Sequence, residues 1–246
     1  YAWSAGTANG NLVSGLTNGS YAVTVTDANG CTAEEAFSIQ TPDSLVLDLA
    51  TQNVSCNGFA DGAASLSVSG GNPGYDITWS DGQSGPDAQN LPAGSFTVAV
   101  IDQQGCTDTL PVTISEPPVL TNDFTIENVS CNGQADGSLQ AQGAGGAGAL
   151  NYSWSTGATA TDLSDLPAGT YILTLTDANN CELLDTAQIT EPTPLTLVLN
   201  NVQDVACNGE ATGALSVTAG GGAGGYTYSW SGGLGDTPDP TGLTAG

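Results

Sequence analysis

The chain has 246 residues, of which 25 are Asp or Glu and none is Lys, Arg or His, so its formal net charge at pH 7 is −25. No side chain can neutralise phosphate, which excludes nucleic acid and anionic lipid surfaces as electrostatic partners. No apolar run approaches the ~20 residues that a membrane-spanning helix needs, so we expect no direct membrane insertion. Each carboxylate must instead face water, accept hydrogen bonds or bind an external cation.

The sequence is a tandem array with a period of about 75 residues. One set of cysteines recurs at this interval: Cys31, Cys106 and Cys181. A second set precedes a tryptophan by 23 residues each time: Cys56 and Trp79, Cys131 and Trp154, Cys207 and Trp230. We therefore divide the chain into a partial repeat (1–41, the C-terminal half), two complete repeats (42–116 and 117–192) and a second partial repeat (193–246, the N-terminal part). This division leads us to expect an excerpt of a longer polypeptide.

In chain order, the expected elements are short strands in which apolar and polar residues alternate. The first, at 21–26, reads YAVTVT and places Tyr21, Val23 and Val25 on one face. The second repeat contributes six strands, near 45–55, 63–69, 75–80, 87–91, 95–101 and 106–115. Asn-Gly and Asp-Gly pairs and glycine runs separate the strands, as turns do. No stretch has a convincing period of 3.6 residues, so we expect essentially no helix.

These elements predict an all-β fold of tandem immunoglobulin-like β-sandwich repeats. Six or seven short strands in about 75 residues, with one tryptophan on the third strand, are typical of such a sandwich. A β-solenoid is the alternative, but the period is long for one solenoid coil and a lone tryptophan suits a closed core better. We expect the core tryptophans to be Trp3, Trp79, Trp154 and Trp230.

The six cysteines, which include no Cys-x-x-Cys pair, favour structural disulfides over a zinc or redox site and imply an oxidising compartment. Pairing within a repeat, which we favour because it gives each repeat its own cross-link, joins Cys56–Cys106 and Cys131–Cys181. Pairing across a repeat boundary joins Cys31–Cys56, Cys106–Cys131 and Cys181–Cys207. A third scheme joins a loop of one repeat to a facing loop of the next, and the sequence does not choose among the three.

One aspartate recurs in the segments TDANG, IDQQG and TDANN, as Asp27, Asp102 and Asp177. An Asp at the start of a turn accepts hydrogen bonds from the backbone that follows it. Calcium is the alternative, because it takes several carboxylate and carbonyl oxygens and the chain is acidic. No complete calcium-loop signature is present, so we favour the turn role. Apart from calcium at these three residues, no cofactor is expected.

Catalysis is a poor fit to this composition. A Ser or Cys nucleophile needs a base, and His and Lys are absent. Two carboxylates can hydrolyse glycosides, but the pair Asp81 and Asp87 is not repeated, because the third repeat has Thr156 in place of the first. The glycine-rich run at 143–150 lacks the Lys-Ser/Thr ending of a phosphate loop. We therefore expect that the chain is not an enzyme.

A consensus of CNG.ADG, GG..Y.W, L.AG.Y.VTVTDANGC and EP runs through the repeats. In the second repeat its residues are Cys56-Asn57-Gly58, Asp61-Gly62, Gly70-Gly71, Tyr75, Trp79, Leu91, Ala93-Gly94, Phe96, Asp102, Gly105-Cys106 and Glu116-Pro117. This consensus resembles the SprB-type repeat of very large cell-surface adhesins of gliding Bacteroidota, and it is similar in look to polycystic-kidney-disease-type domains. The fourth repeat departs from it, with Thr212 where the second and third have Asp61 and Asp136, and this departure argues against a general role for the Asp.

The resemblance implies an extracellular, cell-surface array with a structural or adhesive role, in which the repeats form a stalk or fibre. Its implied partners are neighbouring repeats or copies of the chain, and surface glycans. It also implies O-glycosylation at short Asp-Ser or Asp-Thr signals, at Ser44, Thr109 and Thr186. A self-assembling filament or sheath subunit is an alternative function. A glycan-binding module is a further one, although it would need exposed aromatic platforms and the Trp and Tyr residues fall on core-like positions.

Overall fold

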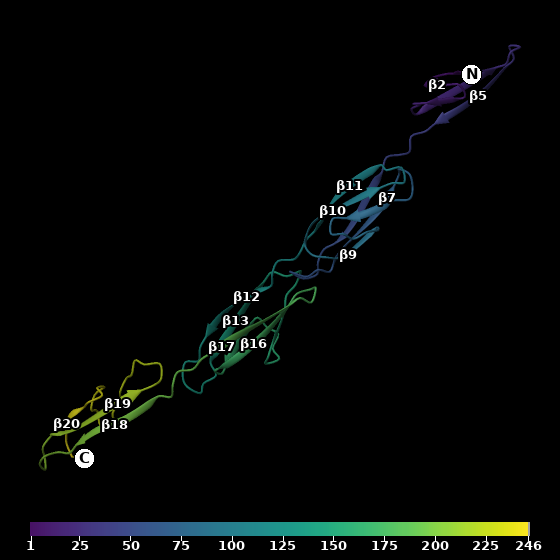
Figure 1. Ribbon diagram of the computed structural model, residues 1–246. Helices are drawn as coiled ribbons and strands as arrows, with labels where there is room; N and C mark the ends of the chain where they lie inside the picture. Colours follow the sequence, from purple (N-terminus) through teal and green to yellow (C-terminus); the bar gives the residue numbers. More distant parts are fainter. Residues whose placement is uncertain (246) are drawn as a thin grey trace. The chain divides into compact units, whose positions relative to one another are not determined.

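The computed structural model describes residues 1–245, apart from the side chains of residues 7 and 9. Within this range it contains twenty β-strands and no helix (Figure 1). Burial alternates along the strands as the sequence does: Ala64 and Leu66 are buried, whereas Ser65 and Ser67 between and beyond them are exposed. The predicted all-β fold is confirmed. No helix long and apolar enough to cross a membrane occurs in the described part of the chain.

The second repeat is a sandwich of two antiparallel three-stranded sheets, ordered β6-β7-β9 and β8-β10-β11. Its strands are β6 (Val46–Gln52), β7 (Gly62–Ser69), β8 (Asp76–Trp79), β9 (Asp87–Leu91), β10 (Gly94–Ile101) and β11 (Thr107–Ile114). The first, second and fourth strands thus form one sheet, and the third, fifth and sixth form the other. This is the division of an immunoglobulin-like sandwich.

The third repeat has the same two sheets, ordered β12-β13-β15 and β14-β16-β17. Its strands are β12 (Thr121–Glu127), β13 (Gly137–Ala144), β14 (Asn151–Trp154), β15 (Asp162–Leu166), β16 (Gly169–Thr176) and β17 (Glu182–Ile189). The predicted repeat of about 75 residues is therefore a structural repeat as well.

The two remaining segments each contain one of the two three-stranded sheets. Residues 1–41 form the sheet β1-β4-β5 and the hairpin β2-β3, and residues 193–245 form the sheet β18-β19-β20. Their strands are β1 (Ala2–Trp3), β2 (Thr7–Asn9), β3 (Leu12–Ser14), β4 (Gly19–Thr26), β5 (Thr32–Ile39), β18 (Thr196–Gln203), β19 (Gly213–Gly220) and β20 (Thr241–Leu243). By strand order and register, β1-β4-β5 corresponds to β8-β10-β11, and β18-β19-β20 corresponds to β6-β7-β9.

By their contacts, the residues fall into two compact units. The first comprises Tyr1–Val54 and Gly58–Ser115, and the second comprises Ser55–Asn57 and the chain from Glu116 onward. The short segment Ser55–Asn57 belongs to the second repeat in sequence, yet it packs with the unit that contains the third. The domain boundaries expected from the sequence stay predictions.

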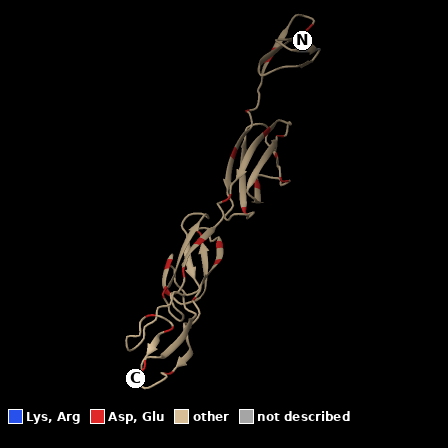
Figure 2. Ribbon diagram, turned by 90° about the vertical axis from the view of Figure 1, so that its left-hand side faces the viewer, with Lys and Arg blue, Asp and Glu red and all other residues tan. Residues whose placement is uncertain are grey.

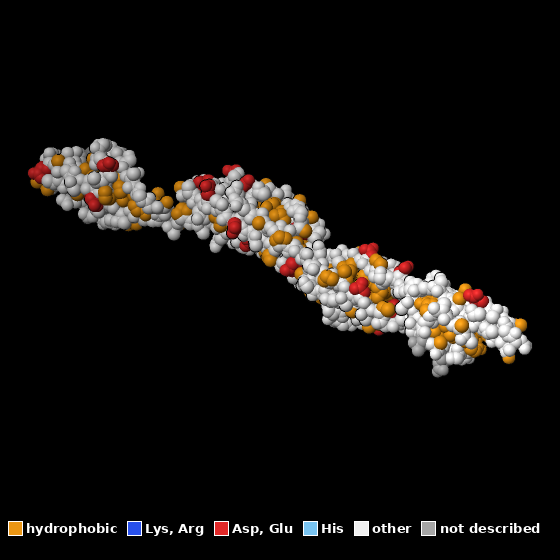
Figure 3. All heavy atoms as spheres, turned by 90° about the horizontal axis from the view of Figure 1, so that it is seen from above, with side chains coloured by type: hydrophobic (Ala, Val, Ile, Leu, Met, Phe, Trp, Pro, Cys, Tyr) orange, Lys and Arg blue, Asp and Glu red, His pale blue; other side chains and the backbone are white. Residues whose placement is uncertain are grey.

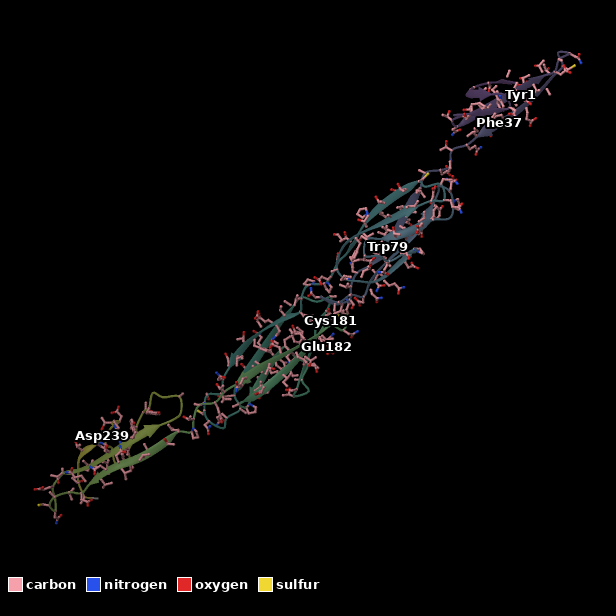
Figure 4. All side chains as sticks on the ribbon, viewed as in Figure 1. Tyr1, Phe37, Trp79, Cys181, Glu182 and Asp239 are labelled. Carbon is pink, nitrogen blue, oxygen red and sulfur yellow. A yellow bond between two sulfur atoms is a disulfide. The ribbon has the colours of Figure 1, made fainter. Side chains whose placement is uncertain are left out.

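Each complete repeat closes its two sheets around one tryptophan. Trp79 and Trp154 are 4% and 3% exposed and lie in the two hydrophobic cores. Figure 4 labels Trp79 among the strands of the second repeat. Each indole N–H donates to a backbone carbonyl six residues further on, at 2.9 Å. Trp3 and Trp230, in the two partial repeats, are only half-buried. A buried tryptophan with a satisfied N–H packs a large apolar area without leaving a donor unpaired.

Candidate functional site

The turn between the last two strands of each repeat is organised by one aspartate. The Oδ1 atom of Asp102 accepts the backbone N–H groups of Gln104 (2.9 Å) and Cys106 (2.8 Å). The carboxylates of Asp27 and Asp177 accept the equivalent two N–H groups at 2.8 to 2.9 Å. In all three repeats the structure therefore gives this residue an Asx-turn role, and a cysteine follows it by four positions.

The other carboxylate oxygen reaches a loop 30 residues away. Asp102 Oδ2 accepts the backbone N–H (2.9 Å) and the side-chain amide (3.2 Å) of Asn72, and Asp177 Oδ2 accepts the backbone N–H of Ala147 (2.7 Å). Both carboxylates are almost completely buried. Glycine permits this approach, because a Cβ at Gly146 would lie 2.9 Å from the Asp177 oxygen. Each buried aspartate thus joins a turn of one sheet to a loop that leads from the other.

These hydrogen bonds keep both aspartates ionised. The N–H of Asn72 is the main cause that lowers the pKa of Asp102 to about 2, against the opposing effect of burial. Burial raises the pKa of Asp177, but the N–H groups of Ala147 and its own turn outweigh it, so that this pKa is lowered. The negative charge of Asp102 in turn raises the pKa of the Cys106 thiol. At neutral pH these carboxylates are buried acceptors.

Acidic side chains are dispersed rather than gathered. Figure 2 shows Asp and Glu spread over the strands and turns of each repeat. No group of three or more Asp, Glu, Cys or His residues that could hold a metal ion occurs among the described residues. Calcium at Asp27, Asp102 and Asp177 stays a prediction, in which the ion would compete with N–H donors for the same oxygens.

A disulfide joins Cys56 to Cys181, with 2.01 Å between the sulfurs and 5.7 Å between the Cα atoms. The loop after β6 is thereby bonded to the turn between β16 and β17. Around the bond, the Ser55 carbonyl accepts the side-chain amide of Asn179 at 2.8 Å, and the Asn57 amide donates to the Pro117 carbonyl at 3.1 Å. The whole site lies within the second compact unit.

The favoured in-repeat pairs, Cys56–Cys106 and Cys131–Cys181, are wrong. The Val54 N–H donates to the Ser115 carbonyl, just beyond the end of β11, whereas Cys106 precedes the start of this strand. An eight-residue strand spans about 27 Å, far beyond the ~4.4–6.8 Å between the Cα atoms of a disulfide. The same argument separates Cys131 from Cys181, because Val129 pairs with Thr190 beyond the end of β17.

The alternative boundary pairs, Cys31–Cys56, Cys106–Cys131 and Cys181–Cys207, are also wrong, because the bond between Cys56 and Cys181 uses one member of two of them and Cys106 and Cys131 are both free. The third scheme, from a loop of one repeat to a loop of the next, describes the observed bond. The remaining cysteines are exposed and unbonded: Cys31, Cys106, Cys131 and Cys207.

The predicted glycosylation residues lie on the surface. Thr109 and Thr186 are exposed on β11 and β17, and Ser44 is exposed just before β6. The aspartate before each threonine accepts the backbone N–H of that threonine at 2.8 Å. Their hydroxyl groups are accessible, and the attachment of sugars stays a prediction.

Tyrosine hydroxyls form contacts that the sequence reasoning missed. The hydroxyls of Tyr21 and Tyr171 donate to the backbone carbonyl four residues earlier, each at 2.7 Å. The hydroxyl of Tyr75 donates to the carbonyl of Gly70 at 2.6 Å. The available signal was the short motifs LTNGSY, LPAGTY and GGNPGY, because each hydroxyl bonds to a carbonyl within its own motif.

Comparison with known proteins finds the SprB repeat at residues 49–84, 124–159 and 199–235, the part of each repeat that holds the first cysteine and the tryptophan. No curated protein matches the chain. Among solved structures, a chain from work on the structural basis for Dscam isoform specificity is 10% identical, with a TM-score of 0.28. The match covers 70% of this chain and 54% of that one, so it spans about half the length of the solved chain.

Proposed function

We propose that this chain, which contains three SprB repeats, is a section of an extracellular, cell-surface fibre. In this function the repeats act as a load-bearing stalk that holds an adhesive end away from the cell. Repetition of one sandwich sets the reach of such a stalk and allows several contacts to act together.

The observation that carries this proposal is the disulfide between Cys56 and Cys181. The two cysteines are 125 residues apart in sequence. Tension that arrives along β6 reaches Cys56 and can pass through the sulfurs to Cys181 and β17, without loading the peptide chain between them. The bond therefore prevents tension from extending residues 57–180. This segment includes five strands of the second repeat and most of the third.

The other side chains support a structural role. The sequence offers no His or Lys as a catalytic base. The tryptophans of the complete repeats are buried in the cores, so they form no exposed platform for a sugar ring. The buried Asp102 and Asp177 are saturated with N–H donors from their own repeats. We propose that the chain is not an enzyme.

Single-molecule pulling on the oxidised and reduced chain tests the load path. At about 3.6 Å per extended residue, the disulfide hides about 450 Å of contour length. We expect full extension of the oxidised chain to be shorter by this amount, and the difference to disappear in dithiothreitol or in the Cys56→Ser variant. Equal lengths in both states would refute the load path.

Immunogold electron microscopy on intact cells tests the location. Antibodies raised against the repeats should place gold outside the outermost membrane, at distances that increase with the number of repeats between the epitope and the cell. Gold confined to the cell interior would contradict the fibre.

A further inference from the structure

In both complete repeats, the loop between the first two strands is bonded to the segment that follows the last strand. In the third repeat, the side-chain amide of Asn132 donates to the Pro192 carbonyl at 3.2 Å. The second repeat has the same bond, from Asn57 to Pro117, at 3.1 Å. Each asparagine belongs to the motif CNG and each proline to the motif EP. These two short motifs of the repeat are therefore in contact with each other.

The dipeptide Asn132-Gly133 has a further contact with the same segment. The Gly133 N–H donates to the Oε2 atom of Glu191 at 2.7 Å. No Lys, Arg or His is present in the chain to compete for this carboxylate, and Figure 3 shows acidic but no basic side chains on the face in view. A carboxylate oxygen thus lies within hydrogen-bond distance of one particular backbone N–H.

An Asn-Gly dipeptide can react with itself. The glycine nitrogen attacks the side-chain carbonyl carbon of the asparagine, closes a five-membered succinimide ring and displaces ammonia. The nitrogen must lose its proton for this attack, because its lone pair is otherwise delocalised into the peptide bond. At Gly133 the space is open, since a Cβ built there would meet no atom within 4 Å. Both Asn132 and Gly133 are exposed, so water can reach the ring.

We propose that Asn132 is a self-modification site at which Glu191 acts as the general base. The Glu191 carboxylate takes the proton of the Gly133 nitrogen, and the electron pair of this nitrogen forms a bond to Cγ of Asn132. The bond from Cγ to Nδ2 breaks, and Nδ2 leaves as ammonia with the proton that Glu191 returns. Water then opens the ring at either carbonyl, which gives aspartate or isoaspartate at position 132.

A second Asn-Gly dipeptide in the chain provides an internal comparison. Asn29 and Gly30 are also exposed, but the Gly30 N–H donates to the backbone carbonyl of Asp27, at 3.1 Å. The carboxylate of Asp27 instead accepts the N–H groups of Asn29 and Cys31. A carbonyl oxygen is far less basic than a carboxylate, so Gly30 has no comparable base on its N–H.

The modification would release the EP segment from the loop. The Asn132 amide donates to the Pro192 carbonyl, whereas a carboxylate at this position can only accept. It would therefore face both this carbonyl and the Glu191 carboxylate without a donor. Isoaspartate also adds a methylene group to the backbone of the loop. Because the loss of ammonia is irreversible, the contact between the two motifs would have a limited lifetime.

Incubation of the full 246-residue chain at neutral pH, followed by Glu-C or Asp-N digestion and mass spectrometry, tests the proposal. Conversion of an amide into a carboxylate raises the mass of the peptide, and protein isoaspartate methyltransferase labels the isoaspartate product. The peptide of Asn132 should convert faster than that of Asn29, by about tenfold or more.

The variant Glu191→Gln separates base catalysis from a purely structural effect. Glutamine keeps an oxygen that can accept the Gly133 N–H but cannot take its proton, so conversion at Asn132 should slow by about tenfold or more. Conversion at Asn29 should not change. Glu182→Gln, which removes another exposed carboxylate of the third repeat, is the matched control and should alter neither rate. Glu191 is exposed and lies outside the strands, so its replacement should not unfold the repeat.

Hydrogen exchange measures the consequence for the contact. The Gly133 amide should exchange slowly in fresh protein and faster after incubation. Asn132→Asp, which places a carboxylate there from the start, should show the fast exchange at once. Exchange that is equally slow in this variant would contradict the predicted release.

Equal rates at the two dipeptides, slower conversion at Asn132 than at Asn29, or an unchanged rate in Glu191→Gln would each overturn the proposed site. The inference goes beyond the proposed fibre. It is measured as a mass change in the isolated chain, independently of load or cell location, so either proposal can fail while the other stands.

Discussion

Removing the disulfide by Cys56→Ser should destabilise the third repeat strongly. In the chain-entropy model, a disulfide contributes to the free energy of unfolding because it restricts the conformations of the unfolded chain. Cys181→Ser should have the same effect, and the double variant should be no worse than either single one, because all three lack the same bond.

The magnitude follows from the length of chain that the bond closes. The chain leaves the first unit after Val54 and again after Ser115. These two points are adjacent, because the Val54 N–H donates to the Ser115 carbonyl. When only the third repeat unfolds, the closed loop therefore runs from about Glu116 to Cys181, roughly 65 residues. The chain-entropy relation gives about 4 kcal/mol for such a loop. A domain of this size has a total stability of roughly 4–11 kcal/mol, so much of it depends on this bond.

Calorimetry of the oxidised chain provides the assay. One kcal/mol shifts the melting temperature of a 60–100-residue domain by about 4–8 °C, so the transition of the third repeat should move down by roughly 15–30 °C. Dithiothreitol should lower the wild-type transition to that of Cys56→Ser and leave the variant unchanged. Cys207→Ser, which removes an exposed unbonded thiol, serves as the control.

A stability loss below about 1 kcal/mol in Cys56→Ser would refute this reasoning. It would mean that the bond is absent in solution, or that the unfolded third repeat stays near the first unit without it. Disulfide mapping of the same sample distinguishes these two explanations.

Three further predictions concern the core and the buried aspartates. Trp154→Ala should cost about 3–5 kcal/mol in denaturant unfolding, whereas Leu184→Ala, at a largely exposed residue of the same repeat, should stay within about 0.5 kcal/mol of wild type. Asp102→Asn should destabilise the second repeat at pH 7. Because the pKa of Asp102 is lowered from 3.8 to about 2, its contribution is complete above pH 3.8 and is lost as the pH falls through 2, so urea unfolding of variant and wild type should converge there. Calcium chelation should leave the melting temperature unchanged, since the Asp102 oxygens already accept N–H groups; a downward shift would establish a calcium site.

The strands and the core were predictable because their signals are local. Alternation in YAVTVT or ASLSVSG fixes which side chains share a face, and a single tryptophan per period has one apolar interior to occupy. The first contact of Asp102 was predictable for the same reason, because an Asx turn bonds two and four residues ahead. The second contact of Asp102, with Asn72, joins segments 30 residues apart, and neither segment has a local sequence pattern that predicts it.

One local signal was misleading. The dipeptides Asp61-Gly62 and Asp136-Gly137 predict turns, yet both glycines begin a strand. A Cβ at Gly62 would lie 2.7 Å from the Ile114 side chain and 2.8 Å from the Leu91 carbonyl. Glycine is needed here because the two sheets approach closely, and a dipeptide alone does not distinguish this need from that of a turn.

The cysteine pairing required a single additional fact, the adjacency of the first and last strands in a repeat. Because Val54 lies beside Ser115, Cys56 lies at the end of the repeat where the chain leaves it. Cys106 precedes β11 and therefore lies one strand length away, at the end where the chain enters the repeat. Each repeat then carries a loop cysteine at one end and a turn cysteine at the other, and the observed bond joins a loop cysteine to a turn cysteine. A contact between these unlike ends is heterologous, and such contacts build open chains unless the rotation between copies closes a ring.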